Sequence, residues 1–191
     1  EVNGLKSAEL SALAWSPSAK PLFAASVEGR LFAYRLRWDG EQRLTGAEIS
    51  AATALIDPAT GKRMNAEGLA FAPAGNGRAA QLLVAPENGA SAWALAAVSP
   101  DLLPPTAQAW PAAIAQALAE PGTKHGVEAI EWHPEHGLMA ALQRPVSTTP
   151  TLHTIHAADG RRWAFTSAAT RADIKAIERI GIERLLVLER V

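Results

Sequence analysis

Two glutamates stand at matching places in two similar stretches of this sequence. Glu67 lies in NAEGLAFAP, residues 65–73, and Glu128 lies in GVEAIEWHP, residues 126–134. In each stretch the carboxylate precedes an apolar run with the alternation of a strand that is buried on one face. If both strands belong to a repeated architecture, the two carboxylates point toward a common axis. There they could bind Ca²⁺, polarise a phosphoester or act as general bases.

A structural role is the alternative for both glutamates. In that case each carboxylate would accept hydrogen bonds from backbone N–H groups or pair with an arginine, and so hold neighbouring sheets together. Calcium usually takes about six to eight oxygen ligands. The five aspartates, at positions 39, 57, 101, 159 and 173, form no cluster in the sequence that would add such ligands. The sequence leaves both roles open.

Repeated elements must position these side chains. Four stretches share the pattern of a strand, a turn and a second strand, namely residues 10–36, 66–95, 127–156 and 174–191, the last being cut short. Apolar residues recur at one register of the first strands: Leu13, Leu69, Ile130 and Ile177. Aromatic residues recur at a second register: Trp15, Phe71 and Trp132. We expect Leu13, Leu69 and Ile130 to be buried at equivalent points, and Trp15 and Trp132 to lie in the core.

The spacing of the repeats indicates the fold class. Their starts lie about 50–60 residues apart, which matches one four-stranded blade of a β-propeller with its connections. The segment 111–120, PAAIAQALAE, is predicted to form a short helix between blades, with Pro111 at its first position. From Ile174 onward the match to the other repeats favours a strand over a helix. We therefore predict an all-β protein.

Composition excludes several functional classes. A length of 191 residues favours one domain, and the net charge of -1 without a basic cluster gives no indication of nucleic-acid binding. No apolar stretch reaches the roughly 18 residues that a membrane span needs. The absence of cysteine excludes disulfides, thiolate metal sites and a cysteine nucleophile. The first ten residues, EVNGLKSAEL, have none of the features of a signal peptide.

Other polar motifs are interpreted as structural. His133 and His136 in HPEH have a spacing seen in zinc sites, but they fall where the other repeats have turns, so a turn is favoured. His153 and His156 are expected on opposite faces of a strand, at the surface or an edge. No Gly-x-Ser-x-Gly elbow is present, and GNG at 75–77 is a turn. Trp93 and Trp110 remain candidates for a carbohydrate platform.

The phrases AEGLA, GVEAIEW and LLVLER together resemble the family described as esterase-like activity of phytase, which consists of phytase-like β-propellers. The stretch LSALAWSPSAKPLFAASVEGRLF is similar to the opening blade of that family. The resemblance implies that residues 1–191 form a single, partial propeller domain of three to four blades, incomplete at its C-terminal end. A further C-terminal segment or another chain would complete it. The family also implies an extracytoplasmic location, periplasmic or secreted.

The resemblance further implies a hydrolase that acts on phosphoester or ester bonds in a carboxylate-lined central channel, with calcium as the cofactor. Glu67 and Glu128 would then be catalytic, and the metal ligands would be Glu67, Glu128, Glu87 and Glu189. Three positions depart from the family pattern, because acidic residues are replaced by Val27, Asn65 and Gln143. These departures favour the alternative, a non-catalytic propeller that serves for binding or assembly.

Overall fold

In the part of the chain that the structure describes, the strands form three four-stranded antiparallel sheets and one two-stranded sheet. The computed structural model describes residues 9–16, 20–57, 60–75, 77–87, 95–98 (backbone), 102, 105–120, 126–144, 149, 151–167, 169–170 and 172–191. Blade 1 contains β1 (Leu10–Trp15), β2 (Pro21–Ser26), β3 (Arg30–Trp38) and β4 (Leu44–Ala54). Blade 2 contains β5 (Ala66–Ala72), β6 (Gln81–Pro86), β7 (Leu95–Val98) and β8 (Thr106–Gln108).

The second half of the chain repeats this arrangement after one helix, α1 (Ala112–Leu118). Blade 3 contains β9 (Val127–His133), β10 (Gly137–Leu142), β11 (Leu152–Ala157) and β12 (Arg162–Thr166). Blade 4 has two strands, β13 (Asp173–Arg179) and β14 (Leu185–Arg190). The predicted helix and the predicted strand at Ile174 are therefore confirmed, although Pro111 takes the N-cap position and the helix ends at Leu118.

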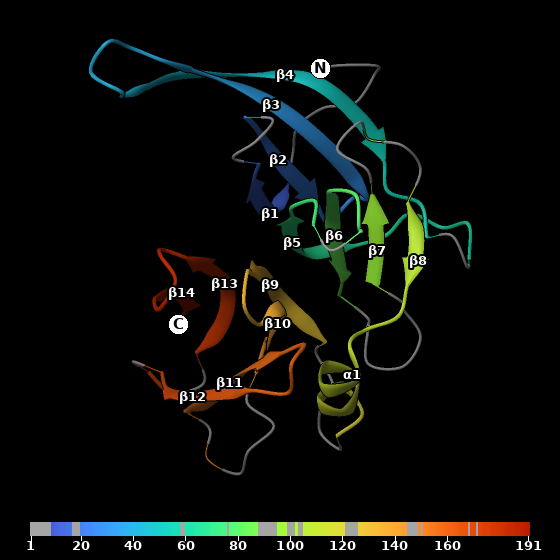
Figure 1. Cartoon of the computed structure of the whole chain (residues 1–191), viewed down its shortest axis with the longest axis vertical. Helices are drawn as coiled ribbons and strands as arrows, with labels where there is room; N and C mark the ends of the chain where they lie inside the picture. Colours follow the sequence, from blue (N-terminus) through green and yellow to red (C-terminus); the bar gives the residue numbers. More distant parts are fainter. Residues whose placement is uncertain are drawn as a thin grey trace.

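The blades follow one another along an arc. Figure 1 shows β1, β5, β9 and β13 at its inner side, with the later strands of blades 1 to 3 farther out. Neighbouring first strands pack together, β1 on β5, β5 on β9 and β9 on β13. The fold is thus a β-propeller whose ring is not closed. In the described part of the chain, no helix is long and apolar enough to cross a membrane.

The first two strands of the four blades pair in equivalent register. The first two strands of each blade pair antiparallel, and the residue at the shared apolar register has an equivalent partner in each case: Leu13 with Ala24, Leu69 with Val84, Ile130 with Ala140, and Ile177 with Val187. In blades 2 to 4 this apolar residue points toward the preceding blade. Leu69 joins the core between blades 1 and 2, Ile130 that between blades 2 and 3, and Ile177 that between blades 3 and 4.

Two residues expected in the core are exposed instead. Leu13 is 56% exposed and Trp15 is 41% exposed, so the prediction of their burial was wrong. The equivalents of Trp15, which are Phe71 and Trp132, do pack into the cores beside the preceding blades. The physical reason is that Leu13 and Trp15 face the side on which a preceding blade would pack. In the described part of the chain no blade lies there to cover them.

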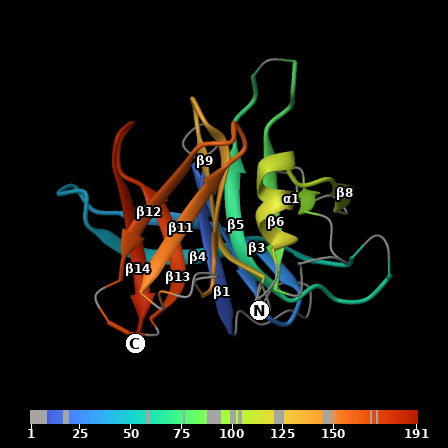
Figure 2. The same cartoon turned by 90° about the horizontal axis from the view of Figure 1, so that it is seen from below.

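The prediction that His153 and His156 lie at the surface was also wrong, since both are buried. They do face opposite sides of β11, as the strand period requires. His153 stacks on Phe165 of β12 and interacts with Glu189 of β14, whereas His156 lines a cavity beside α1. Both faces of β11 are covered, so both histidines are largely shielded from solvent. Residues of α1 contact β11, and in Figure 2 the helix lies to the right of β11 and β12.

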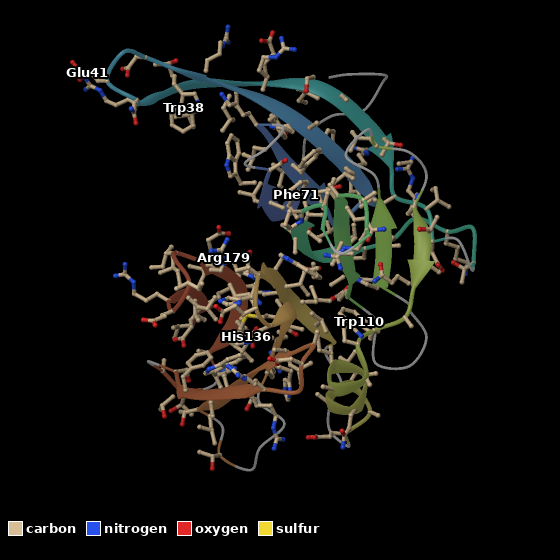
Figure 3. All side chains as sticks on the ribbon, in the orientation of Figure 1. Trp38, Glu41, Phe71, Trp110, His136 and Arg179 are labelled. Atoms are coloured by element: carbon tan, nitrogen blue, oxygen red, sulfur yellow. The ribbon has the colours of Figure 1, made fainter. Side chains whose placement is uncertain are left out.

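The hairpin of β3 and β4 is longer than those of the other blades. Its far end carries Trp38 and Glu41 away from the remaining sheets (Figure 3). At its near end Gly29 has a φ of 71°, and a Cβ there would lie 2.9 Å from the Met64 carbonyl oxygen. Only glycine fits this turn without strain. The hydrogen bond from Leu55 N to Gly29 O, at 2.9 Å, closes the hairpin against the chain leading to blade 2.

Candidate functional site

A cavity of about 850 Å³ lies where the first strands of all four blades meet. Its charged lining residues are Glu9, Glu67, Glu87, Glu128, Glu178, Lys175 and Arg190. Apolar side chains of the first strands, among them Leu13, Leu69, Ile130 and Ile177, complete the wall. The two glutamates singled out in the sequence therefore do face one cavity. With five carboxyl groups against two cationic groups, the cavity is acidic.

A β-bulge in each first strand aims one side chain into this cavity. The register shifts once in every pairing of first and second strands, and the extra residues are Ser11, Glu67, Glu128 and Lys175. We call these four residues the bulge set. A bulge bends its strand and re-aims the side chain of the extra residue. The matched positions of Glu67 and Glu128 thus have a backbone cause, and the set extends to Ser11 and Lys175.

Sequence reasoning missed Ser11 and Lys175. The signal was present, since each stands two residues before the shared apolar register, as Glu67 and Glu128 do. Both bind the neighbouring blade. The Ser11 hydroxyl donates a hydrogen bond to the Ala66 carbonyl oxygen, and the Lys175 ammonium forms an ion pair with Glu128. The Glu128 side chain is 4% exposed, so this ion pair is buried.

A second set of equivalent residues lines the cavity where each second strand ends. Its members are Val27, Glu87, Gln143 and Arg190. Three of them donate a backbone hydrogen bond in the same way, from Val27 N to Glu9 O at 3.2 Å, from Glu87 N to Asn65 O at 3.0 Å, and from Gln143 N to Gly126 O at 3.4 Å. Two of the residues that depart from the family pattern, Val27 and Gln143, therefore occupy the positions equivalent to Glu87.

The predicted ligands other than Glu67 and Glu128 have partners of their own. The Asn65 amide donates a hydrogen bond to the Glu87 carboxylate. Glu189 is not among the residues that line the cavity, and it interacts with His153 of blade 3 instead. Arg190, next to it, faces the cavity and binds Asp173 at 3.0 Å.

Glu67 has the most perturbed carboxyl group of the cavity. Its pKa is raised from 4.5 to about 7, mainly by burial and also by the charges of Glu128 and Glu87, although Lys175 and Arg190 lower it in part. Asp173, at the edge of the site, behaves in the opposite way. Burial raises the pKa of its carboxyl group, but hydrogen bonds from Arg144 and Arg190 outweigh that effect and hold it below its usual value. Near pH 7 Glu67 can therefore both accept and release a proton.

The carboxylates of the cavity, in the positions that the structure shows, do not form a calcium site. Glu128 is engaged by Lys175 and Glu87 by Asn65. Among the described residues, no three His, Asp or Glu side chains gather closely enough to hold one ion. A divalent cation would have to displace the Lys175 ammonium before Glu67 and Glu128 could share it. Calcium binding thus stays a prediction, and no chemical step is derived from it.

Of the two histidines at the β9–β10 turn, His133 links blade 3 to blade 4, whereas His136 pairs within blade 3. His133 Nδ1 accepts hydrogen bonds from the backbone N–H groups of Glu135 and His136, so its Nε2 carries the proton and donates to Ile182 O at 2.8 Å. His136 Nδ1 lies 2.9 Å from a carboxylate oxygen of Asp159. The turn predicted for HPEH is present, but His133 is buried in it.

Of the two tryptophans proposed as a carbohydrate platform, Trp110 packs on the core between blades 2 and 3, and Trp93 lies outside the described residues.

Comparison with solved structures returns chains of low sequence identity. One described as "Structure of U3-55K" is 9% identical with a TM-score of 0.46, over 96% of this chain and 46% of that one. Another, the Cps50 (Swd1) beta-propeller domain of Myceliophteria thermophila, is 15% identical with a TM-score of 0.41, over 98% of this chain and 51% of that one. The chain thus spans about half the length of these structures. A search of curated protein sequences finds no match.

The family model gives a more specific result. It matches residues 6–191, nearly the whole chain, and its description is "Phytase-like: Esterase-like activity of phytase". The match includes both strands of blade 4 and every residue of the bulge set. It agrees with the resemblance found in the sequence and with the repeated four-stranded blades. The chain belongs to the phytase-like family of esterase-like activity of phytase.

Proposed function

We propose that the protein is a hydrolase of ester bonds that works in the acidic central cavity, with Glu67 as its general base. The observation that carries the proposal is the Glu67 carboxyl group, whose pKa of about 7 is matched to proton transfer near neutral pH. It faces a cavity large enough for a small ester, and the Lys175 ammonium, two blades further along, lines the same cavity.

The reaction follows from these positions. The Glu67 carboxylate takes a proton from a water molecule, whose oxygen forms a bond to the ester carbonyl carbon. The ion pair with Glu128 keeps Lys175 in place. The Lys175 ammonium stabilises the negative charge on the former carbonyl oxygen. The bond to the leaving alkoxide then breaks, and Glu67 returns the proton to that oxygen. Acid and alcohol leave, and Glu67 is again ionised.

The charge of the cavity selects among substrates. With five glutamates and two cationic side chains in its wall, the cavity repels anions. Neutral or cationic carboxylic esters are therefore preferred to phosphoesters. Hydrolysis of a phosphoester would need a cation to shield the carboxylates, and this is the role that the predicted calcium ion would have.

Turnover of two chromogenic substrates tests the proposal. We expect hydrolysis of p-nitrophenyl acetate to exceed that of p-nitrophenyl phosphate without added metal, and the rate to rise with pH through about 7 as Glu67 ionises. Glu67→Gln should lower kcat/KM by about 10²–10⁴-fold. Glu41→Gln, at the exposed end of the β3–β4 hairpin, is the matched control and should have no effect. Equal activity of wild type and Glu67→Gln would refute the role of Glu67.

A non-catalytic propeller is the second candidate, and the Glu128–Lys175 pair favours it. This pair joins blades 3 and 4, and Asp173, bound to Arg144 and Arg190, adds a second charged network nearby. In that case the central charges stabilise the blades, and the protein serves for binding or for assembly with a chain that completes the ring. Absence of turnover in the wild type, together with a large loss of stability in Lys175→Met, would favour this function.

A further inference from the structure

A second cavity, of about 250 Å³, lies between α1 and the turn that joins β11 to β12. One wall comes from a single face of the helical segment, since its residues recur three or four positions apart: Ala113, Gln116, Ala117 and Glu120. All residues that line the cavity belong to the segment 113–162, in the middle of the chain. The cavity is therefore formed by α1 and blade 3 without either end of the chain.

Strand pairing places a histidine and an arginine side by side in the opposite wall. His156 of β11 and Arg162 of β12 are direct partners in the antiparallel register, so their side chains lie on the same face of the sheet. The turn between the two strands adds Gly160 and Arg161 to the wall. The Arg161 Nε lies 3.6 Å from a carboxylate oxygen of Asp159, which keeps this guanidinium near the turn.

The buried imidazole of His156 indicates that this cavity takes a ligand. The residue is 9% exposed, and among the described residues its ring nitrogens have no hydrogen-bond partner. A buried polar group without a partner is costly, so such groups usually contact a bound molecule or ordered water. Burial lowers the pKa of His156, although Glu120 raises it in part and Arg162 lowers it further. The ring is therefore neutral near pH 7, with one N–H donor and one acceptor.

The charge of the cavity favours an anion. Two guanidinium groups, those of Arg161 and Arg162, line it together with one carboxylate, that of Glu120. The central cavity has the opposite balance and repels anions. A guanidinium group binds a carboxylate through two parallel hydrogen bonds, a geometry that suits this anion better than a spherical one.

The other lining groups fit the rest of such a ligand. The side chains of Gln116 and His156 can each donate a hydrogen bond to a carboxylate oxygen. The methyl groups of Ala113 and Ala117 offer an apolar surface to a short hydrocarbon chain. Sites for small molecules combine a few polar groups with apolar surface in this way, and those for drug-sized ligands are larger, about 300–1,000 Å³. This cavity is thus suited to a short-chain acid.

We propose that this cavity binds a small organic carboxylate, which is held by Arg162 and His156 of blade 3 and by Gln116 of α1. The ligand links the helix to the blade, because its carboxylate contacts both. The site is separate from the central cavity, and it does not depend on Glu67 acting as a base.

Titration with sodium butyrate, followed by NMR of the histidine rings, tests this site. We expect a Kd of about 1 mM for a ligand of this size. The bound anion should shift the ring signals of His156 and raise its pKa. Arg162→Gln should weaken binding at least about 10-fold, as expected for a lost hydrogen bond to a charged group. Arg43→Gln, which removes an exposed guanidinium from the β3–β4 hairpin, is the matched control and should bind like the wild type.

Three more variants separate a binding site from a structural cavity. Glu120→Gln removes a like charge and should tighten butyrate binding by about 2–5-fold. Ala113→Phe places a ring in the cavity and should abolish the shift of His156. Urea denaturation of both variants checks that they remain folded. Glu67→Gln, in the central cavity, should leave the titration unchanged, so a failure of the esterase proposal and a failure of this one are distinguishable.

Each of the following results would overturn the proposal. Unshifted His156 signals at about ten times the expected Kd would mean that the cavity holds only water. Equal shifts with sodium chloride at the same ionic strength would reduce the effect to charge screening. Tighter binding of inorganic phosphate than of butyrate would exclude a carboxylate as the ligand class. Wild-type affinity in Arg162→Gln would exclude the guanidinium that the proposal places on the ligand.

Discussion

Replacement of Glu67 by glutamine should make the protein more stable at high pH and leave its stability unchanged at low pH. In the folded state burial and the neighbouring Glu128 and Glu87 raise the pKa of Glu67 from 4.5 to about 7. Between these values the folded protein binds more protons than the unfolded chain, so its stability falls as the pH rises. The loss is complete above the folded-state pKa and absent below the unfolded-state pKa. Glutamine does not titrate, so the variant avoids the loss.

The magnitude follows from the same two pKa values. Each pH unit between 4.5 and about 7 corresponds to about 1.4 kcal/mol, which gives an upper limit of about 3 kcal/mol. Partial solvent contact of Glu67 and relaxation of the cavity reduce this to about 1–2 kcal/mol. In a protein of this size the melting temperature of Glu67→Gln should therefore exceed that of the wild type by about 2–8 °C at pH 8. At pH 4.5 the two should melt together.

Calorimetric melts of both proteins from pH 4.5 to 8.5 measure this difference directly. Only the difference between the two proteins is used, because Glu131 and Glu178 have raised pKa values of the same cause, burial, and contribute equally to both. Glu41→Gln, which removes an exposed carboxylate, should follow the wild type at every pH. If Glu67→Gln melted below the wild type at pH 8, the carboxylate would be a stabilising group, and its proposed role as a base near neutral pH would fall with it.

Three further outcomes follow from the structure. Lys175→Met should lower the free energy of unfolding, measured in urea, by about 1–3 kcal/mol, because it leaves Glu128 buried without its cation. It should also shift the pH–rate profile to higher pH, because Lys175 lowers the pKa of Glu67. An unchanged profile would contradict this. If calcium binds, it should raise the melting temperature of the wild type but not of Glu67→Gln/Glu128→Gln, and a wild type without a shift would exclude the predicted metal site. His133→Phe should cost about 1–3 kcal/mol by removing the hydrogen bond to Ile182, and unchanged urea denaturation would show that this link does not stabilise blade 4.

The architecture could be predicted because local sequence patterns determine it. Apolar residues at fixed offsets marked the first strands, and their spacing corresponded to a four-stranded blade. Glu67 and Glu128 could be recognised as equivalent for the same reason, since they stand at the same sequence spacing before Leu69 and Ile130, respectively. These features depend on strand period and register, which a chain repeats whenever it repeats a blade.

Burial could not be predicted in the same way, because it depends on what lies against a strand. Leu13 has the same local pattern as Leu69, yet one is exposed and the other buried. The difference comes from a neighbouring blade, present in one case and absent from the described residues in the other. His153 and His156 show the reverse error. Their spacing correctly placed them on opposite faces of β11, but blade 4 and α1 cover both faces.

The bulge set explains why chemistry at this centre can change while the fold does not. A bulge positions whatever residue it contains, so serine, glutamate and lysine occur at equivalent points of successive blades without any difference in strand pairing. Lys175 takes a position that a third glutamate could hold, and its ion pair neutralises Glu128. Glu67 consequently has no cationic partner at hydrogen-bonding distance among the described residues and keeps its raised pKa. The lysine thus ties up one carboxylate of the set, while the other remains available to exchange protons.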